Sequence, residues 1–195
     1  MRSLFFLVTA ALLAGAPACT SSVPVGTVSL DGTYVGTVTG SDAWIAAYAS
    51  GKQIAVYACG GSASFQTASR WYFGTIDARH ATVSAEGWTI DLDLSEGHAI
   101  GTMTPPSATA MTFDAKSARS GSFEGLYVAT DDGRRTGVIV RQDVGKDPIV
   151  QGTWFGEADA RAQVTPIKPV SANVFDVTFS FNAQARTLTV KPFTF

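Results

Sequence analysis

Two aspartates in a short alternating segment are the residues whose spacing comes nearest to a catalytic pair. Asp91 and Asp93 lie two apart within residues 88–94, so in a strand both carboxylates project from one face. A pair of carboxylates can act as general acid and base in hydrolysis, or can chelate a cation. Apolar residues alternate with them, which is typical of a half-buried strand whose aspartates face solvent. We expect the solvent-facing arrangement, and a carboxylate-based hydrolase is the alternative function.

Another acidic position occurs twice, in two segments that match each other. Residues 72–79 and 154–161 share the pattern aromatic-Phe-Gly-x-x-Asp-Ala-Arg, which contains Asp77 in the first segment and Asp159 in the second. The arginine two residues after each aspartate can bond a nearby carboxylate or carbonyl group. We expect these arginines to have a structural role.

Cysteine and histidine chemistry has few candidates. Cys59 ends an apolar segment, and His80 and His98 are the only histidines of the sequence. A cysteine in such a segment is typically a small buried apolar residue, which is the role we expect. A disulfide between Cys19 and Cys59 is the alternative. It would need an oxidising compartment, to which the N-terminal residues described below would direct the protein.

Aromatic residues beside predicted turns are the remaining candidates for a binding site. They could rim a pocket for a small apolar ligand or a sugar ring, although most aromatic side chains of a small domain pack in its core. The candidate pocket residues are Trp44, Tyr72, Trp88 and Trp154, and the same group of aromatics includes Tyr48, Trp71, Phe73 and Phe155.

Motifs for other chemistry are missing from the sequence. It has no His-Glu-x-x-His, Cys-x-x-Cys or His-x-His metal motif, no Gly-x-Ser-x-Gly nucleophile elbow, and no phosphate-binding or dinucleotide glycine motif. The formal net charge is −2, which argues against nucleic acid as a partner because nucleic-acid binders concentrate positive charge. We therefore expect a protein that is not an enzyme and that has no metal or other cofactor.

The N-terminal residues have the composition of an export signal. Arg2 precedes an apolar stretch at 4–13 that is too short to span a bilayer, and small residues follow at 15–18. We predict that residues 1–18 are a signal peptide and that the mature protein is extracytoplasmic.

Cys19 directly follows Ala18, and this small-x-Ala-Cys sequence resembles the lipobox of bacterial lipoproteins. The resemblance implies that Cys19 carries lipid and joins the protein to a membrane, with residues 19–27 as a flexible tether. Ala16 and Ala18 also form an A-x-A site for the general signal peptidase. Cleavage there without lipidation would give the alternative, a secreted or soluble periplasmic protein.

The remaining residues, 28–195, predict one all-β domain. Short alternating segments separated by Gly, Asp and Ser predict strands throughout, and no amphipathic helix is predicted after the leader. Aromatic residues make up 11% of the sequence and charged residues only 15%, a composition typical of strands and turns.

The sequence predicts that the domain contains two related halves, at about 28–116 and 121–195, and the alternative is that strands of similar composition resemble one another. Residues 32–35 match 125–128, and a Gly-Lys turn at 51–52 matches another at 145–146. The order of matching features is kept while their spacing drifts, as expected of an internal duplication with loop insertions.

An antiparallel meander closing as an up-and-down barrel of about ten strands is the predicted fold, and a two-sheet sandwich is the alternative. This architecture resembles the small barrels of lipocalins and avidins. The final residues, ending at Phe195, resemble the closing strand of bacterial outer-membrane barrels.

The function predicted from these features is a lipid-anchored binding or envelope-interaction protein, whose ligand and protein partners the sequence does not identify. Besides the hydrolase, the alternatives are a purely structural envelope protein and an outer-membrane barrel.

Overall fold

The structure, a computed structural model, describes residues 29–195. The predicted signal peptide, Cys19 and the predicted tether lie outside the described residues. Within the described range the elements are strands, one short helix α1 (Phe65–Ala68) and one 3-10 turn η1 (Glu157–Asp159). In this range no helix is long and apolar enough to cross a bilayer.

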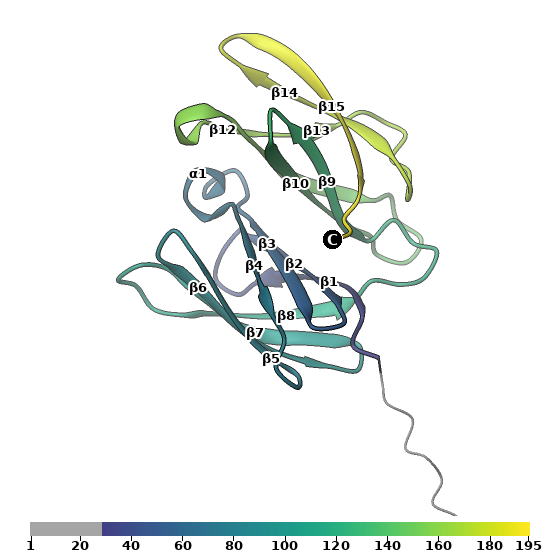
Figure 1. The fold of residues 1–195 in the computed structure, drawn as a ribbon. Coiled ribbons are helices and arrows are strands. Elements are labelled where there is room, and N and C mark those ends of the chain that lie inside the picture. Colours follow the sequence, from purple (N-terminus) through teal and green to yellow (C-terminus); the bar gives the residue numbers. More distant parts are fainter. Residues whose placement is uncertain (1–28) are drawn as a thin grey trace, which may run out of the picture.

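The first half forms an eight-stranded antiparallel sheet, with the strand order β4-β3-β2-β1-β8-β7-β6-β5. Its edge strands β4 and β5 follow one another in the chain, and a Cβ added to Gly74 of β4 would lie only 2.6 Å from Cγ1 of Val83 of β5. The sheet therefore curls into a nearly closed barrel, called here the first barrel (Figure 1). Its strands are β1 (Gly32–Val38), β2 (Trp44–Ser50), β3 (Gln53–Cys59), β4 (Arg70–Thr75), β5 (His80–Ala85), β6 (Trp88–Ser95), β7 (His98–Thr104) and β8 (Met111–Ser117).

The second half forms a seven-stranded sheet with the order β12-β11-β10-β9-β15-β14-β13, called here the second barrel. This sheet also curls, so that its edge strands β12 and β13, which are consecutive in the chain, approach each other (Figure 1). Its strands are β9 (Gly125–Asp131), β10 (Arg134–Arg141), β11 (Ile149–Phe155), β12 (Arg161–Gln163), β13 (Thr165–Pro166), β14 (Phe175–Phe181) and β15 (Gln184–Pro192).

Strand alternation in the sequence explains which side chains fill each barrel. On β6, Ile90, Leu92 and Leu94 are buried while Asp91 and Asp93 are exposed, as the period of two predicts. Strand β3 is different, because nearly every residue on both of its faces is buried. Strands buried on both faces have continuous apolar sequences, and β3 has one because the second barrel covers its outer side.

The two barrels share one strand order, which supports the predicted duplication. In each, the first strand pairs with both the second and the last strand, and the edges are formed by the fourth and fifth strands. The second barrel has one strand fewer. A single strand, β15, lies between β14 and β9, whereas two strands, β7 and β8, lie between β6 and β1 in the first barrel.

A tyrosine on the first strand of each barrel makes the same hydrogen bond. The Tyr34 hydroxyl donates to the carbonyl oxygen of Leu30 at 2.8 Å, and the Tyr127 hydroxyl donates to that of Phe123 at 2.9 Å. Both acceptors lie four residues before the tyrosine, and both acceptor side chains pack on their own barrel core. These tyrosines occupy the matching positions of segments 32–35 and 125–128, so the structural and sequence repeats coincide here.

The repeated eight-residue segment, in contrast, falls on different strands. Tyr72 lies on β4, the fourth strand of its barrel, whereas Trp154 lies on β11, the third strand. In both places the first aromatic side chain enters its own core and the following phenylalanine faces the other barrel, because neighbouring strand residues point to opposite sides.

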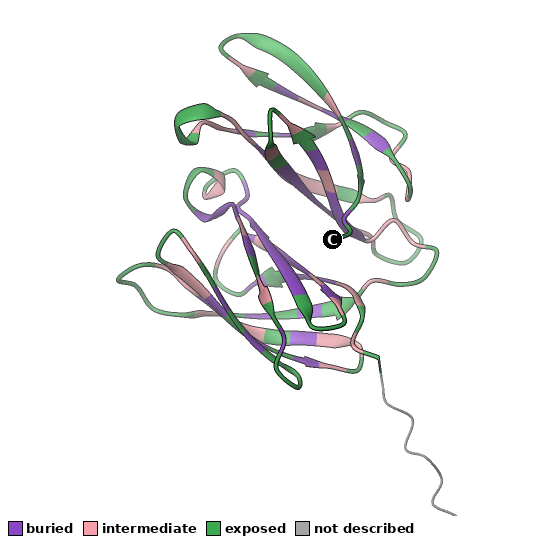
Figure 2. Cartoon of the chain, in the orientation of Figure 1, coloured by how far each residue is buried: buried purple, intermediate pink, exposed green. Residues whose placement is uncertain are grey.

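Each barrel has a core of its own, and a third apolar cluster joins the two barrels. The first core is built around residues such as Ile90 and Leu92, and the second around Val138 and Val177. The buried members of the third cluster are Val35, Ala46, Ala55, Tyr57, Cys59, Leu126, Ile139 and Phe193. Buried residues accordingly line the facing sides of both barrels in Figure 2.

The predicted all-β antiparallel architecture is confirmed. Closure takes place within each half rather than in one ring of about ten strands, because β1 pairs with β8 and β9 pairs with β15. These pairings occupy the strand edges that a single ring would have used to join the halves.

Candidate functional site

An aromatic cluster lies where the two barrels meet. On β4, Tyr72 points into the first core, so Trp71 and Phe73 on either side of it point outward toward the second barrel. Their rings are stacked, with centroids 5.8 Å apart and planes 9° from parallel. Tyr48 of β2 belongs to the same outward-facing surface.

Phe193, just after β15, completes this cluster. Its backbone N–H donates to the carbonyl oxygen of Leu126 at 2.8 Å, which holds the segment after Pro192 against β9. The Phe193 ring is 5% exposed and lies 5.3 Å from Trp71 and 5.4 Å from Tyr48, measured between centroids. The final segment of the chain therefore packs between the barrels.

A cavity of about 350 Å³ opens beside these rings, and we call it the aromatic groove. It is lined by Phe73 of the first barrel, by Val128, Thr130 and Arg135 of the second, and by residues 191–195. Phe73 and Phe195 remain 43% and 50% exposed, so aromatic rings are presented to solvent. Exposed rings beside a buried aromatic base form a surface on which a flat apolar ring can pack.

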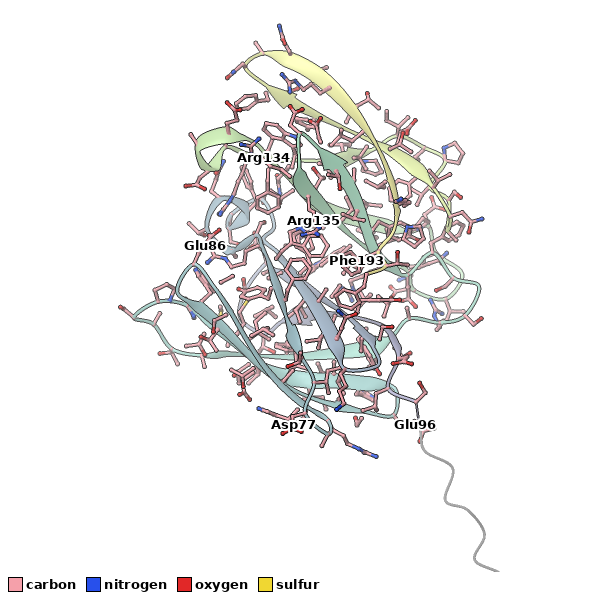
Figure 3. The ribbon with its side chains drawn as sticks, in the orientation of Figure 1. Asp77, Glu86, Glu96, Arg134, Arg135 and Phe193 are labelled. Carbon is pink, nitrogen blue, oxygen red and sulfur yellow. The ribbon has the colours of Figure 1, made fainter. Side chains whose placement is uncertain are left out.

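Two cations border the groove. The Arg135 guanidinium lies over the Phe73 ring, 4.9 Å from its centroid, and the Arg135 carbonyl oxygen accepts a hydrogen bond from Trp71 Nε1 at 3.3 Å. Lys191 provides the second charge. No acidic side chain is among the described residues that line this cavity. Figure 3 shows Arg135 and Phe193 together in the space between the barrels.

The four aromatic residues predicted to line a pocket are not brought together. Tyr72 is 1% exposed inside the first core, and Trp154 is 5% exposed inside the second, stacked on Phe179 at 4.7 Å. Trp88 packs at the margin of the first core under the Arg70 guanidinium, and Trp44 lies between the barrels under Arg141.

Three of the accompanying aromatics, Tyr48, Trp71 and Phe73, do converge on Phe193, and Phe73 also lines the groove. The groove residues that sequence reasoning missed are Phe193, Phe195 and Arg135. The alternation Pro192-Phe193-Thr194-Phe195 was a signal for the first two, since one face of that segment is aromatic. No pattern in the sequence indicated Arg135, whose place depends on how the barrels pack.

Asp91 and Asp93 face outward on the exposed side of β6. His80 lies between them, with ring nitrogens 3.4 Å from a carboxylate oxygen of Asp91 and 3.1 Å from one of Asp93. Thr82 donates to Asp91 at 2.9 Å. All four side chains are exposed, so this is a cross-strand polar cluster on an open sheet surface. In the described part of the chain, no group of three or more His, Cys, Asp or Glu residues could hold a metal ion.

The repeated arginines differ in their surroundings. Arg161 has a side chain only 8% exposed, pairs with Glu86 at 3.2 Å and donates to the carbonyl oxygen of Gln66. Glu86 also pairs with Arg70 at 3.5 Å. Arg161 thus bonds both a carboxylate and a carbonyl, and it links the second barrel to the first. Arg79 and Asp77 are exposed in the turn between β4 and β5, and Asp159 is exposed in η1.

Cys59 is fully buried between the barrels, so its predicted character as a buried residue is confirmed. Its Sγ lies 3.7 Å from the hydroxyl of Thr153, which in turn contacts the hydroxyl of Ser69 at 2.9 Å. Burial raises the pKa of the Cys59 thiol and keeps it neutral. A buried neutral thiol is a poor nucleophile.

A second cavity, of about 480 Å³, lies at one end of the second barrel between Phe123, Pro148 and Val170. Its two lysines each have a nearby carboxylate: Lys146 lies 3.3 Å from Asp143, and Lys168 lies 3.8 Å from Asp147. The charges there are mutually compensated, whereas Arg135 and Lys191 at the aromatic groove have no such partners among the described residues.

Comparison with known proteins supplies no relative for this chain: no family model, no curated protein and no solved structure matches it.

Proposed function

We propose that this protein is an exported, lipid-anchored binding protein that holds a small ring-shaped ligand in the aromatic groove between its two barrels. The observation that carries the proposal is the pair of exposed rings, Phe73 and Phe195, beside the buried ring of Phe193 in a cavity of about 350 Å³. Ligand sites of proteins are concave and upward of about 300 Å³ in volume.

The position of the groove supports a binding role. Its walls come from both barrels and from residues 191–195, and sites between packed units are common places for ligands. The Phe73 ring stacks on Trp71 and the Phe195 ring lies against Phe193, and both of these partners belong to the third apolar cluster. A preformed surface loses little conformational entropy when a ligand binds.

The anchor part of the proposal is supported by the sequence alone. The leader at 1–18 directs export, and lipid on Cys19 would hold the protein at a membrane of the cell envelope. A tether at 19–27 would let the two barrels face outward from that membrane.

Ligand binding is tested by NMR titration of the protein with D-glucose, cellobiose and benzyl alcohol as ring-bearing probes. We expect at least one probe to bind, and we expect the double substitution Phe73→Ala with Phe195→Ala to weaken that binding by about tenfold or more. The control is Ile100→Ala, which removes another exposed apolar side chain, 51% exposed, from β7 on the first barrel. Equal binding by the groove variant and the control would contradict the proposal.

The ligand and the anchor can also be identified from protein purified from its host. Native mass spectrometry should show a copurified small molecule that is lost from the Phe73→Ala, Phe195→Ala variant. Mass spectrometry of the mature N-terminus should show a lipid-modified Cys19, and Cys19→Ser should release the protein from the membrane fraction. An unmodified N-terminus at position 19 would exclude the anchor while leaving the groove untested by that measurement, so the titration decides the binding role separately.

A further inference from the structure

The two cations of the aromatic groove are placed by strand register. Arg135 of β10 pairs with Thr130 of β9, and Lys191 of β15 pairs with Val128 on the other side of β9. Val128 and Thr130 are two residues apart, so all four side chains leave the same face of the sheet, the face that lines the groove.

The spacing allows both cations to reach one anionic group. Arg135 and Lys191 lie on the two strands that flank β9, two interstrand distances across and two residues along, so their Cα atoms are about 12 Å apart. Their side chains are long enough to bring both charged groups to one anion. The Arg135 guanidinium lies over the Phe73 ring, 4.9 Å from its centroid. A guanidinium binds a carboxylate with two parallel hydrogen bonds, and an ammonium adds a point charge.

Among the described residues, no acidic side chain pairs with either cation of this site. Neither Arg135 nor Lys191 has an acidic side chain within 4.0 Å in the described part of the chain, although the protein as a whole is acidic, with a formal charge of −2. A neutral ligand packed on the rings would partly remove both cations from water without compensation, which is unfavourable. A ligand that carries its own anion avoids that cost.

We infer that the ligand is a cyclic carboxylate, with its ring packed against Phe73 and Phe195 and its carboxylate bound by Arg135 and Lys191. This inference rests on the proposed function and narrows it to one chemical class. Thr130 and Thr194, which also line the groove, provide hydroxyl groups for the polar edge of the ring. The volume of about 350 Å³ suits one or two rings. Acidic sugars and aromatic acids both have this chemistry.

Matched pairs of probes separate the charge from the ring. D-glucuronate is compared with D-glucose, and benzoate with benzyl alcohol, by NMR titration of the whole protein at low salt. We expect the anion of at least one pair to bind about tenfold more tightly than its neutral partner, and we expect added NaCl to reduce this ratio. Preference confined to the first pair identifies an acidic sugar, and preference confined to the second pair identifies an aromatic acid.

Charge variants complete the test. Arg135→Gln combined with Lys191→Gln should reduce the anion-to-neutral ratio to about one while leaving the neutral probe bound. The control, Arg79→Gln with Arg186→Gln, removes two exposed cations that do not line the groove and should keep the ratio. NMR spectra of each variant confirm that it is folded.

The outcomes distinguish the inference from the proposed function. A ratio near one in the unmodified protein, or a ratio unchanged by the groove charge variant, overturns the cyclic carboxylate. If the neutral probes still bind, and the Phe73→Ala, Phe195→Ala variant binds them more weakly, the proposed function stands although the cyclic carboxylate does not. If none of the four probes binds, both the inference and the proposed function fail.

Discussion

The ring of Tyr57 on β3 lies against Gly137 on β10, and this contact joins the two barrels. A Cβ added at position 137 would lie 2.4 Å from Cζ of Tyr57, well inside any van der Waals contact. Tyr57 is fully buried and touches Trp71, with centroids 4.7 Å apart, so the ring has no free space to move into. Glycine at 137 is therefore required by the close approach of the second barrel.

The substitution Gly137→Ala should lower the free energy of unfolding by about 1–3 kcal/mol, the usual cost of overpacking a core. Urea unfolding measures this cost. In a Tyr57→Ala background the same substitution should cost much less, because the clashing ring is gone, even though Tyr57→Ala is itself destabilising. An equal cost of Gly137→Ala in both backgrounds would show that the contact between these residues is not the reason for glycine.

Glu86 should stabilise the protein through two arginines from different barrels. The Arg70 and Arg161 side chains are 6% and 8% exposed, and Glu86 lies 3.5 Å and 3.2 Å from them. Glu86→Gln leaves two mostly buried guanidinium groups without an anion, so we expect a loss of about 1 kcal/mol, limited by the exposure of Glu86 itself.

Glu96→Gln is the matched control, because Glu96 is exposed in the turn between β6 and β7 and makes no ion pair with any described residue. Figure 3 shows the two glutamates at different parts of the first barrel. The control should change the free energy of unfolding by less than about 0.5 kcal/mol. Equal effects at both positions would refute a specific role of Glu86.

The repeated tyrosines should each contribute to stability through the hydrogen bond that each makes, and the Tyr127 hydroxyl also lies 3.3 Å from the carbonyl oxygen of Ala172. Tyr34→Phe and Tyr127→Phe each remove a hydroxyl that donates to a carbonyl four residues earlier, so each should cost about 1 kcal/mol in thermal or urea unfolding. Tyr72→Phe is the control, since its buried hydroxyl has no hydrogen-bond partner. This control should be neutral or slightly stabilising, and a loss as large as that of the other two would argue against the assigned hydrogen bonds.

At alkaline pH, the free energy of unfolding should fall more steeply with rising pH than it would if all ionisable groups were exposed. Burial raises the pKa of the Cys59 thiol above 9.0 and the pKa of Tyr127 from 10.0 to about 12. An acid whose pKa is raised by folding releases its proton more readily when unfolded. The contribution of these two groups to the free energy of unfolding should therefore be constant from neutral pH to about pH 8 and fall as the pH rises through 9 toward 12.

Urea unfolding at pH 7 and at pH 10 measures this fall. Cys59→Ala removes one of the buried acids, so the difference between the two pH values should become smaller in that variant, whatever its stability at pH 7. An unchanged difference would mean that the thiol ionises equally in the folded and unfolded states.

The amino-acid sequence by itself determined the all-β class and the apolar face of strands such as β6, and it predicted two related halves. These features follow from local patterns: the alternation around Asp91 and Asp93, the turns such as Glu86-Gly87, and the paired segments that contain Tyr34 and Tyr127. Alternation decides which face of a strand is apolar and turns decide where the strand ends, so a single chain contains this information.

Only the tertiary structure decided how the halves close and which aromatic residues meet. Trp154 and Tyr72 have similar local sequences, but each fills a different core, while Phe73 and Phe193, which are 120 positions apart, share one cavity. The local sequence pattern predicts which face of a strand a side chain projects from, but it does not predict which part of the protein packs against that face. The approach of Tyr57 to Gly137, and with it the placing of Arg135 beside the aromatic groove, results from packing between two sheets that no short segment specifies.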